Sequence, residues 1–185
     1  VVNRSKMGAT ISKGESLVQH DLNRGLEADY ALVAYGGNDS DYDWAAIDAD
    51  PAGDHRPRTE LPAFREKLRH TVTMLREKGI QPVLMSLPPI DAARYLAFIC
   101  RDGLRKERIM DWLGDVQMIY RHQEMYSDAV TQLAYAEGLP LIPVREEFLN
   151  DHRLMRLIAA DGIHLTMPGY ERLFDTLADW LRIRV

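Results

Sequence analysis

The chain has 185 residues, of which 46% are hydrophobic and 28% are charged. This length and composition suit a single domain with a sizeable core. The formal net charge is −5 at pH 7 and the pI is near 5.7, which argues against a protein whose main task is to bind nucleic acid or an anionic membrane. No segment approaches the ~20 consecutive apolar residues of a transmembrane helix.

Cys100 is the only cysteine, so the chain can form neither an internal disulfide nor a cysteine metal cluster. A reducing compartment fits this composition, and we expect a cytoplasmic protein. The chain begins with Val1 and shows no secretion signal in its first residues. Secretion through a preceding signal remains open.

Short apolar runs alternate with longer amphipathic ones, which indicates an α/β fold. Residues 30–35 form a continuous apolar run that ends at Gly36, as expected for a strand buried on both faces of a parallel sheet. Residues 83–87 repeat the pattern and stop at Pro88, and residues 139–144 offer a third, shorter strand.

The clearest helix is predicted over residues 60–78, where apolar side chains recur at steps of four, four and three up to Gly79. Residues 14–27 and 119–137 predict two more helices. A last helix should begin near Pro168. Its expected inner face consists of Tyr170, Leu173, Phe174, Leu177 and Leu181.

Strands separated by helices predict a three-layer α/β/α sandwich around a parallel sheet. One domain should span residues 1–185, with residues 90–118 as a helical insertion over one end of the sheet. Ligands bind such folds outside the carboxyl ends of the strands. The loops of interest are therefore residues 36–44, 88–91 and 161–166.

Asp161 and His164 are the strongest candidates for chemistry. A carboxylate that binds one nitrogen of an imidazole fixes its tautomer and stabilises the imidazolium, while the other nitrogen takes a proton from a nucleophile. The spacing across Gly162 lets both side chains turn the same way. The alternative is that Asp161 caps the following helix and His164 is an ordinary loop residue.

Asn38 and Gly8 are candidate oxyanion donors. The Asn38 amide follows the strand at residues 30–35 and can donate to a developing negative charge, and the Gly8 N–H can do the same because glycine permits close approach. Alternatively, both residues belong to ordinary turns.

Asp39, Asp41 and Asp43 invite a calcium-loop interpretation, which fails because Trp44 and Asp50 stand where that loop requires Gly and Glu. An irregular metal site and a solvated acidic loop remain as interpretations.

Residues 42–58 and 90–118 should line the substrate cleft. We expect Trp44, Tyr95 and Trp112 to contribute its walls, together with Phe98, because ligand pockets are lined mainly by apolar and aromatic side chains. The same aromatic side chains can instead pack the insertion onto the body of the domain.

Three short signals fall in one order along the chain. They are Gly8 within N-x-x-x-x-G-x-T, Asn38 within G-x-N-D, and Asp161 with His164 within D-x-x-H. Together they resemble the SGNH hydrolases, also called the GDSL lipase/esterase family, over nearly the whole chain.

This resemblance implies a flavodoxin-like domain that hydrolyses esters with a serine nucleophile and no cofactor. Gly8 and Asn38 correspond to the family's oxyanion donors, and Asp161 and His164 to its catalytic acid and base. The family's nucleophile lies in a Gly-Asp-Ser motif after the first strand, and no serine in this chain follows Gly-Asp.

The first strand of the family lies between the second and third, so its loss would expose two rows of backbone polar groups. We therefore expect a strand and helix before Val1 in the native protein, carrying the nucleophile.

The leading hypothesis is thus a serine esterase that acts on small acyl esters, such as acetylated carbohydrates or short-chain lipids. The first alternative is a non-catalytic binding module on the same fold. The second is metal-dependent hydrolysis by His164 with Asp39, Asp41 or Asp43. The expected partner is a small-molecule ester, and the sequence leaves the oligomeric state open.

Overall fold

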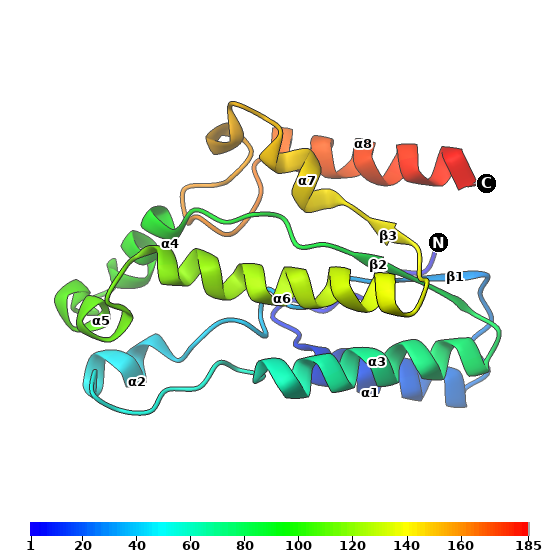
Figure 1. The fold of residues 1–185 in the computed structure, drawn as a ribbon, viewed down its shortest axis with the longest axis horizontal. Coiled ribbons are helices and arrows are strands. Elements are labelled where there is room, and N and C mark those ends of the chain that lie inside the picture. The colour runs from blue at the N-terminus through cyan, green and yellow to red at the C-terminus, as the bar shows by residue number, and fades with distance from the viewer. Residues whose placement is uncertain (185) are drawn as a thin grey trace. The chain divides into compact units, whose positions relative to one another are not determined.

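The computed structural model describes residues 1–184, with side chains up to residue 182 (Figure 1). Its elements in chain order are α1 (Ile11–Asn23), β1 (Tyr30–Val33), α2 (Trp44–Ala49), α3 (Leu61–Glu77), β2 (Gln81–Met85), α4 (Ala92–Cys100), α5 (Lys106–Leu113), α6 (Gln117–Ala136), β3 (Leu141–Ile142), α7 (Val144–Leu149), the short 3₁₀ helix η1 (Leu154–Arg156) and α8 (Met167–Arg184). None of the described helices combines the length and apolar character needed to cross a membrane.

The sheet has the strand order β1-β2-β3. β1 and β2 run parallel, from the pair Tyr30 and Gln81 to the pair Val33 and Leu84. The Leu84 N–H donates to the Pro140 carbonyl at 2.9 Å, just before β3. Helix α3 makes the crossover from β1 to β2. The expected α/β fold with a parallel sheet is therefore confirmed.

The chain divides into two compact units that interleave in sequence. The first contains residues 1–41, 56–87 and 125–141, and the second contains residues 42–55, 88–124 and the chain from residue 142 on.

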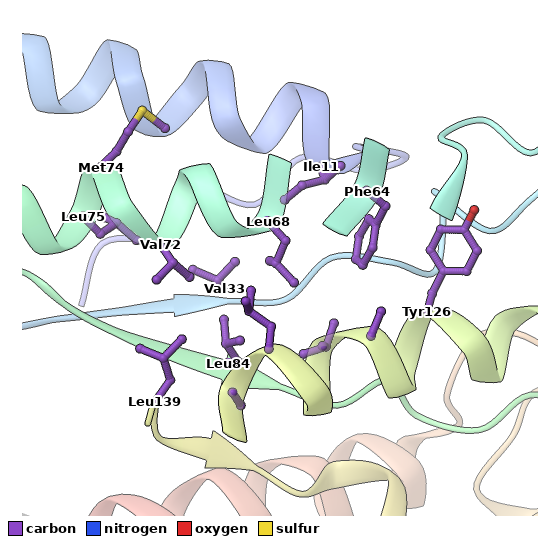
Figure 2. Close-up of a cluster of buried hydrophobic side chains, with 14 of the residues drawn as sticks. Ile11, Val33, Phe64, Leu68, Val72, Met74, Leu75, Leu84, Tyr126 and Leu139 are labelled. Carbon is purple, nitrogen blue, oxygen red and sulfur yellow. The ribbon is translucent and has the colours of Figure 1, made fainter. Parts of the chain in front are cut away.

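The first unit has a core built from α1, α3, the two longer strands and the second half of α6 (Figure 2). Phe64, Leu68, Val72 and Leu75 of α3 are at most 1% exposed, which confirms the predicted apolar face of that helix. Fully burying side chains of this size stabilises a fold by about 1.5–3 kcal/mol each.

The second unit has its own core. It gathers buried side chains from α2, α4, α5 and the start of α6, namely Ile47, Ala92, Tyr95, Leu96, Ile109, Leu113 and Ile119. Residues 90–118 contain α4, a turn at residues 101–103, α5 and the first residues of α6.

Two predictions about buried faces are wrong. Tyr30 and Leu32 of β1 are each 50% exposed, because β1 ends the strand order and one of its faces is left open by the described residues. On α8, Tyr170, Phe174 and Leu181 are 51%, 69% and 49% exposed, whereas Leu173 and Leu177 are partly buried. Helical spacing identified an apolar stripe correctly, but it could not tell what covers that stripe.

Helix α1 also differs from its prediction over residues 14–27. It begins at Ile11, whose N–H is bound by the Asp39 carboxylate, and it ends before Gly25, which has a φ of +78°. A residue with positive φ stops a helix, and glycine adopts that conformation at little cost.

Candidate active site

Asp161 and His164 lie in contact in the loop before α8. The His164 Nδ1 is 2.8 Å from the Asp161 Oδ2. The Asp161 Oδ1 accepts two further bonds, from the backbone N–H groups of Ile163 and His164, each at 3.0 Å. The carboxylate is 19% exposed and the imidazole 66% exposed. An Nδ1–H that donates to Asp161 leaves Nε2 unprotonated in the neutral ring, so an accessible nitrogen can accept a proton.

The alternative role of Asp161 as a helix cap is excluded. Helix α8 begins at Met167, and its cap is Thr166, whose Oγ1 accepts from the Gly169 N–H at 3.3 Å. Thr166 also donates to the Arg156 carbonyl at 2.6 Å. The Asp161 carboxylate therefore binds the backbone of its own loop and the imidazole of His164.

The loop that carries the pair is closed by backbone hydrogen bonds. Ile158 and Leu165 form an antiparallel bridge, and the Ala159 N–H donates to the His164 carbonyl at 2.8 Å. The Gly162 N–H donates back to the Ala159 carbonyl at 3.0 Å. These bonds close the backbone of the loop that carries the Asp161 and His164 side chains.

Hydrogen bonding sets the charge state of Asp161. Partial burial raises the pKa of this carboxyl, but the N–H groups of His164 and Ile163 and the His164 ring together bring its pKa below the usual 3.8. Asp161 is therefore ionised throughout the neutral range. An ionised carboxylate on Nδ1 is the group that stabilises an imidazolium during proton transfer.

Helix α4 braces this loop through two residues that were not among the sequence candidates. The Asp91 N–H donates to the Gly162 carbonyl at 2.8 Å. The Arg94 guanidinium donates to the carbonyls of Met155 (3.1 Å) and Ile158 (2.8 Å). Asp91 is a residue type that favours the start of a helix, and in the structure its side chain caps α4 by accepting from the N–H groups of residues 93 and 94. Nothing in the sequence indicated the Arg94 contacts, which link residues 61 and 64 positions apart.

Asn38 and the turn containing Gly8 lie together in the first unit. The Asn38 Nδ2 donates to the Ala9 carbonyl at 3.2 Å, and this amide nitrogen has a second hydrogen that can donate to a ligand. Gly8 is exposed and has a φ of +70°, a conformation that L side chains rarely adopt. The two predicted oxyanion donors therefore come from one local structure.

The three aspartates after β1 have separate roles. The Asp39 carboxylate is buried against the N–H of Ile11. Asp41 pairs with Arg58 at 3.2 Å, and Asp43 caps α2 by accepting from the Ala46 N–H. Among the described residues, no three His, Cys, Asp or Glu side chains are placed to hold a metal ion.

The predicted aromatic walls form one cluster in the second unit. Trp44 makes edge contacts with Tyr95 and Trp112, with ring centroids 6.1 and 6.5 Å apart. Tyr42 makes edge contacts with both tryptophans, with ring centroids 5.7 Å from Trp44 and 4.9 Å from Trp112. Tyr95 is only 8% exposed, and it therefore packs the core of this unit, whereas both tryptophans are partly exposed.

The serines of the chain all belong to the first unit. They are Ser5, Ser12, Ser16, Ser40, Ser86 and Ser127. Ser40, Ser86 and Ser127 are at most 7% exposed. The Ser127 hydroxyl accepts from the Leu87 N–H at 3.1 Å, which is a structural role.

Comparison with known structures identifies the same fold in several enzymes. An acetylxylan esterase from Geobacillus stearothermophilus superposes with a TM-score of 0.65 at 16% identity, over 97% of this chain and 71% of that one. A GDSL-like lipase from Bacteroides thetaiotaomicron gives 0.65 at 14% identity, over 96% and 73%. A lipase/acylhydrolase from Enterococcus faecalis gives 0.61 at 18% identity, over 96% and 72%.

Sequence comparison points in the same direction. The chain is 23% identical over 118 residues to the isoamyl acetate-hydrolyzing esterase of Saccharomyces cerevisiae, a match that covers 63% of this chain and 46% of that protein. The matched region thus spans less than half of the yeast enzyme. Residues 1–172 match the sequence pattern of the GDSL-like lipase/acylhydrolase family. The chain therefore belongs to the GDSL-like lipase/acylhydrolase family, also known as the SGNH hydrolases.

Proposed function

We propose that this protein is a serine esterase that removes small acyl groups, such as acetyl, from an alcohol or a carbohydrate. The observation that carries the proposal is the 2.8 Å contact between the His164 Nδ1 and the Asp161 carboxylate. The similarity to acetylxylan esterases and to an isoamyl acetate esterase supports small esters as substrates.

In the proposed mechanism, a serine hydroxyl attacks the ester carbonyl and His164 Nε2 takes its proton. Asp161 stabilises the resulting imidazolium. The family resemblance assigns Asn38 and Gly8 as the donors to the tetrahedral oxyanion, and His164 as the group that returns the proton to the departing alcohol. Water repeats these steps on the acyl-enzyme and releases the acid.

The serine of this mechanism would come from the family's Gly-Asp-Ser motif, which lies upstream of the segment that starts at Val1 in the family pattern. A fluorophosphonate probe, which labels activated serines, tests this assignment directly. Labelling of the full-length protein, followed by peptide mass spectrometry, should place the adduct on a serine outside residues 1–185. An adduct on Ser5 or on any other serine of this chain would refute the assignment.

The reaction itself is tested by hydrolysis of p-nitrophenyl acetate by the full-length protein. His164→Ala should lower kcat by about 10³-fold or more, since a triad member is lost. The matched control is His152→Ala, because His152 is also exposed and lies in the same unit; this variant should retain wild-type turnover. Equal rates for wild type and His164→Ala would refute the proposal.

The same assay separates the alternatives. A binding module on this fold would bind esters without turnover and would not react with the fluorophosphonate. Metal-dependent hydrolysis would be abolished by EDTA, whereas the proposed serine mechanism would continue at an unchanged rate.

A further inference from the structure

A buried carboxylate next to Asn38 has no part in the proposed proton transfers. Asp39 is 0% exposed. Its Oδ1 accepts from the Ile11 N–H at 2.9 Å, and its Oδ2 lies 3.2 Å from the same nitrogen. The Thr59 hydroxyl and the Gly36 N–H also donate to this carboxylate. A buried charge with several donors is held in one orientation, since any rotation would leave it unpaired.

These contacts join three segments of the first unit. Ile11 is the first residue of α1, Gly36 precedes Asp39 in its own loop, and the Thr59 N–H donates to the Asp39 carbonyl at 3.1 Å. Ile11 is fixed from its other side as well, because its fully buried side chain points into the core (Figure 2).

The two candidate oxyanion donors lie next to the contact between Asp39 and Ile11 in the sequence. Asn38 directly precedes Asp39, and its amide donates to the Ala9 carbonyl two residues before Ile11. Gly8 is the residue before Ala9, in a turn closed by the bond from the Ala9 N–H to the Lys6 carbonyl at 3.2 Å. The Asn38 and Asp39 side chains therefore connect the same two segments at neighbouring points.

We propose that Asp39 is a positioning residue that holds the Gly8 turn and Asn38 in register, so that both donors can reach the carbonyl oxygen of an acyl ester. This inference rests on the proposed esterase function. Asp39 touches no reacting atom; it acts through Ile11 and the residues on either side of the two donors. Because an oxyanion exists only during the reaction, misplaced donors lower kcat and leave KM nearly unchanged.

Burial raises the pKa of Asp39 above its usual value, although the hydrogen bonds from Thr59, Ile11 and Gly36 oppose the rise. For a raised carboxyl pKa, the contribution to stability is present at low pH and is lost as the pH rises through the folded-state value. The ionised form thus costs stability at neutral pH. The ionised Asp39 carboxylate therefore serves to fix the positions of its hydrogen-bond donors, and it does not stabilise the fold.

The test measures kcat and KM for p-nitrophenyl acetate in the full-length protein. Asp39→Ala should lower kcat by about 10- to 100-fold, which is the order expected for a displaced oxyanion donor, with KM changed by less than about threefold. Asp39→Asn keeps one acceptor oxygen for the Ile11 N–H and should lose only about three- to tenfold of kcat. The control is Asp41→Ala, which removes a carboxylate from the same loop and should stay within about threefold of wild type.

A second measurement separates positioning from general damage. If Asp39 acts through the oxyanion donors, its loss should cost clearly less kcat in an Asn38→Ala background than in the wild type, since one of the two donors that it holds is already gone. Independent multiplication of the two losses would overturn the inference. So would wild-type kcat in both Asp39 variants.

Two further outcomes are decisive. If Asp39→Ala does not fold, then Asp39→Asn decides, and wild-type kcat in that variant overturns the inference. If the wild-type protein turns over no ester, the proposed function fails and this inference fails with it. If the wild type hydrolyses the ester and both Asp39 variants keep wild-type kcat, the inference about Asp39 fails while the proposed function stands.

Discussion

Gly162 determines how Asp161 and His164 face one another. Its φ of +82° turns the chain between the two side chains. A Cβ at this position would lie 2.5 Å from the Tyr95 nitrogen and 2.6 Å from the Asp91 oxygen, both in the backbone at the start of α4. Glycine is therefore required at position 162 for two reasons: its positive φ and the close approach of the α4 backbone.

Gly162→Ala should lower both stability and turnover. Alanine at positive φ costs about 1–2 kcal/mol, and the clash with α4 adds a further ~1–3 kcal/mol of overpacking. The control is Gly79→Ala, because Gly79 has a φ of +73° and no atom near its missing Cβ. Urea unfolding and p-nitrophenyl acetate kinetics should show a larger loss for Gly162→Ala in both measurements. Equal losses for the two variants would contradict a special role for the contact with α4.

The Asp161–His164 pair could be predicted from sequence because its geometry is local. Three residues separate the partners, and a glycine lies between them. The supports of the site could not be predicted in this way. The Asp39 carboxylate binds the backbone of a residue 28 positions earlier, and Arg94 binds carbonyls more than 60 positions later. Backbone partners carry no sequence signal, so such contacts become visible only in the folded chain.

Helices show the same division between local and long-range information. The sequence correctly placed α3, α6 and α8, and the spacing of apolar residues gave an apolar side for α3 and α8. On α3 that side is buried, but on α8 it is exposed at Met167, Tyr170, Phe174 and Leu181. Periodicity is a property of one helix, whereas burial depends on what packs against it.

Two phenylalanines test how burial, as distinct from residue type, affects stability. Phe64 of α3 is fully buried and Phe174 of α8 is 69% exposed. Phe64→Ala should lower the free energy of unfolding by about 3–5 kcal/mol, whereas Phe174→Ala should change it by no more than about 0.5 kcal/mol. Urea unfolding monitored by circular dichroism gives both values. A loss above about 2 kcal/mol for Phe174→Ala would mean that this side chain is covered in the native protein.

Across the molecule, most of the perturbed carboxyl groups stabilise the fold in their charged form. Burial raises the pKa of Glu15, but bonds from His70 and Lys67 lower it overall. Hydrogen bonds from Arg105 lower the pKa of Asp48, and the Arg153 N–H lowers that of Asp151. Asp161 behaves in the same way. A lowered pKa gives stability that is present above the unfolded-state value and is lost as the pH falls through the folded-state value.

The protein should therefore lose thermal stability as the pH falls below the ordinary carboxyl values of 3.8 and 4.5. Asp39 opposes this trend, because its raised pKa makes the folded state bind a proton more readily than the unfolded chain. Asp39→Asn removes that compensation, so the Tm of the variant relative to wild type should be more favourable at pH 7 than at pH 4. A difference of 1 kcal/mol corresponds to about 2–4 °C in a protein of this size. Glu15→Gln should show the opposite trend, since the charge that it removes is stabilising near neutrality. If the Tm difference between Asp39→Asn and wild type were the same at both pH values, the carboxyl group of Asp39 would not be buried as the structure has it.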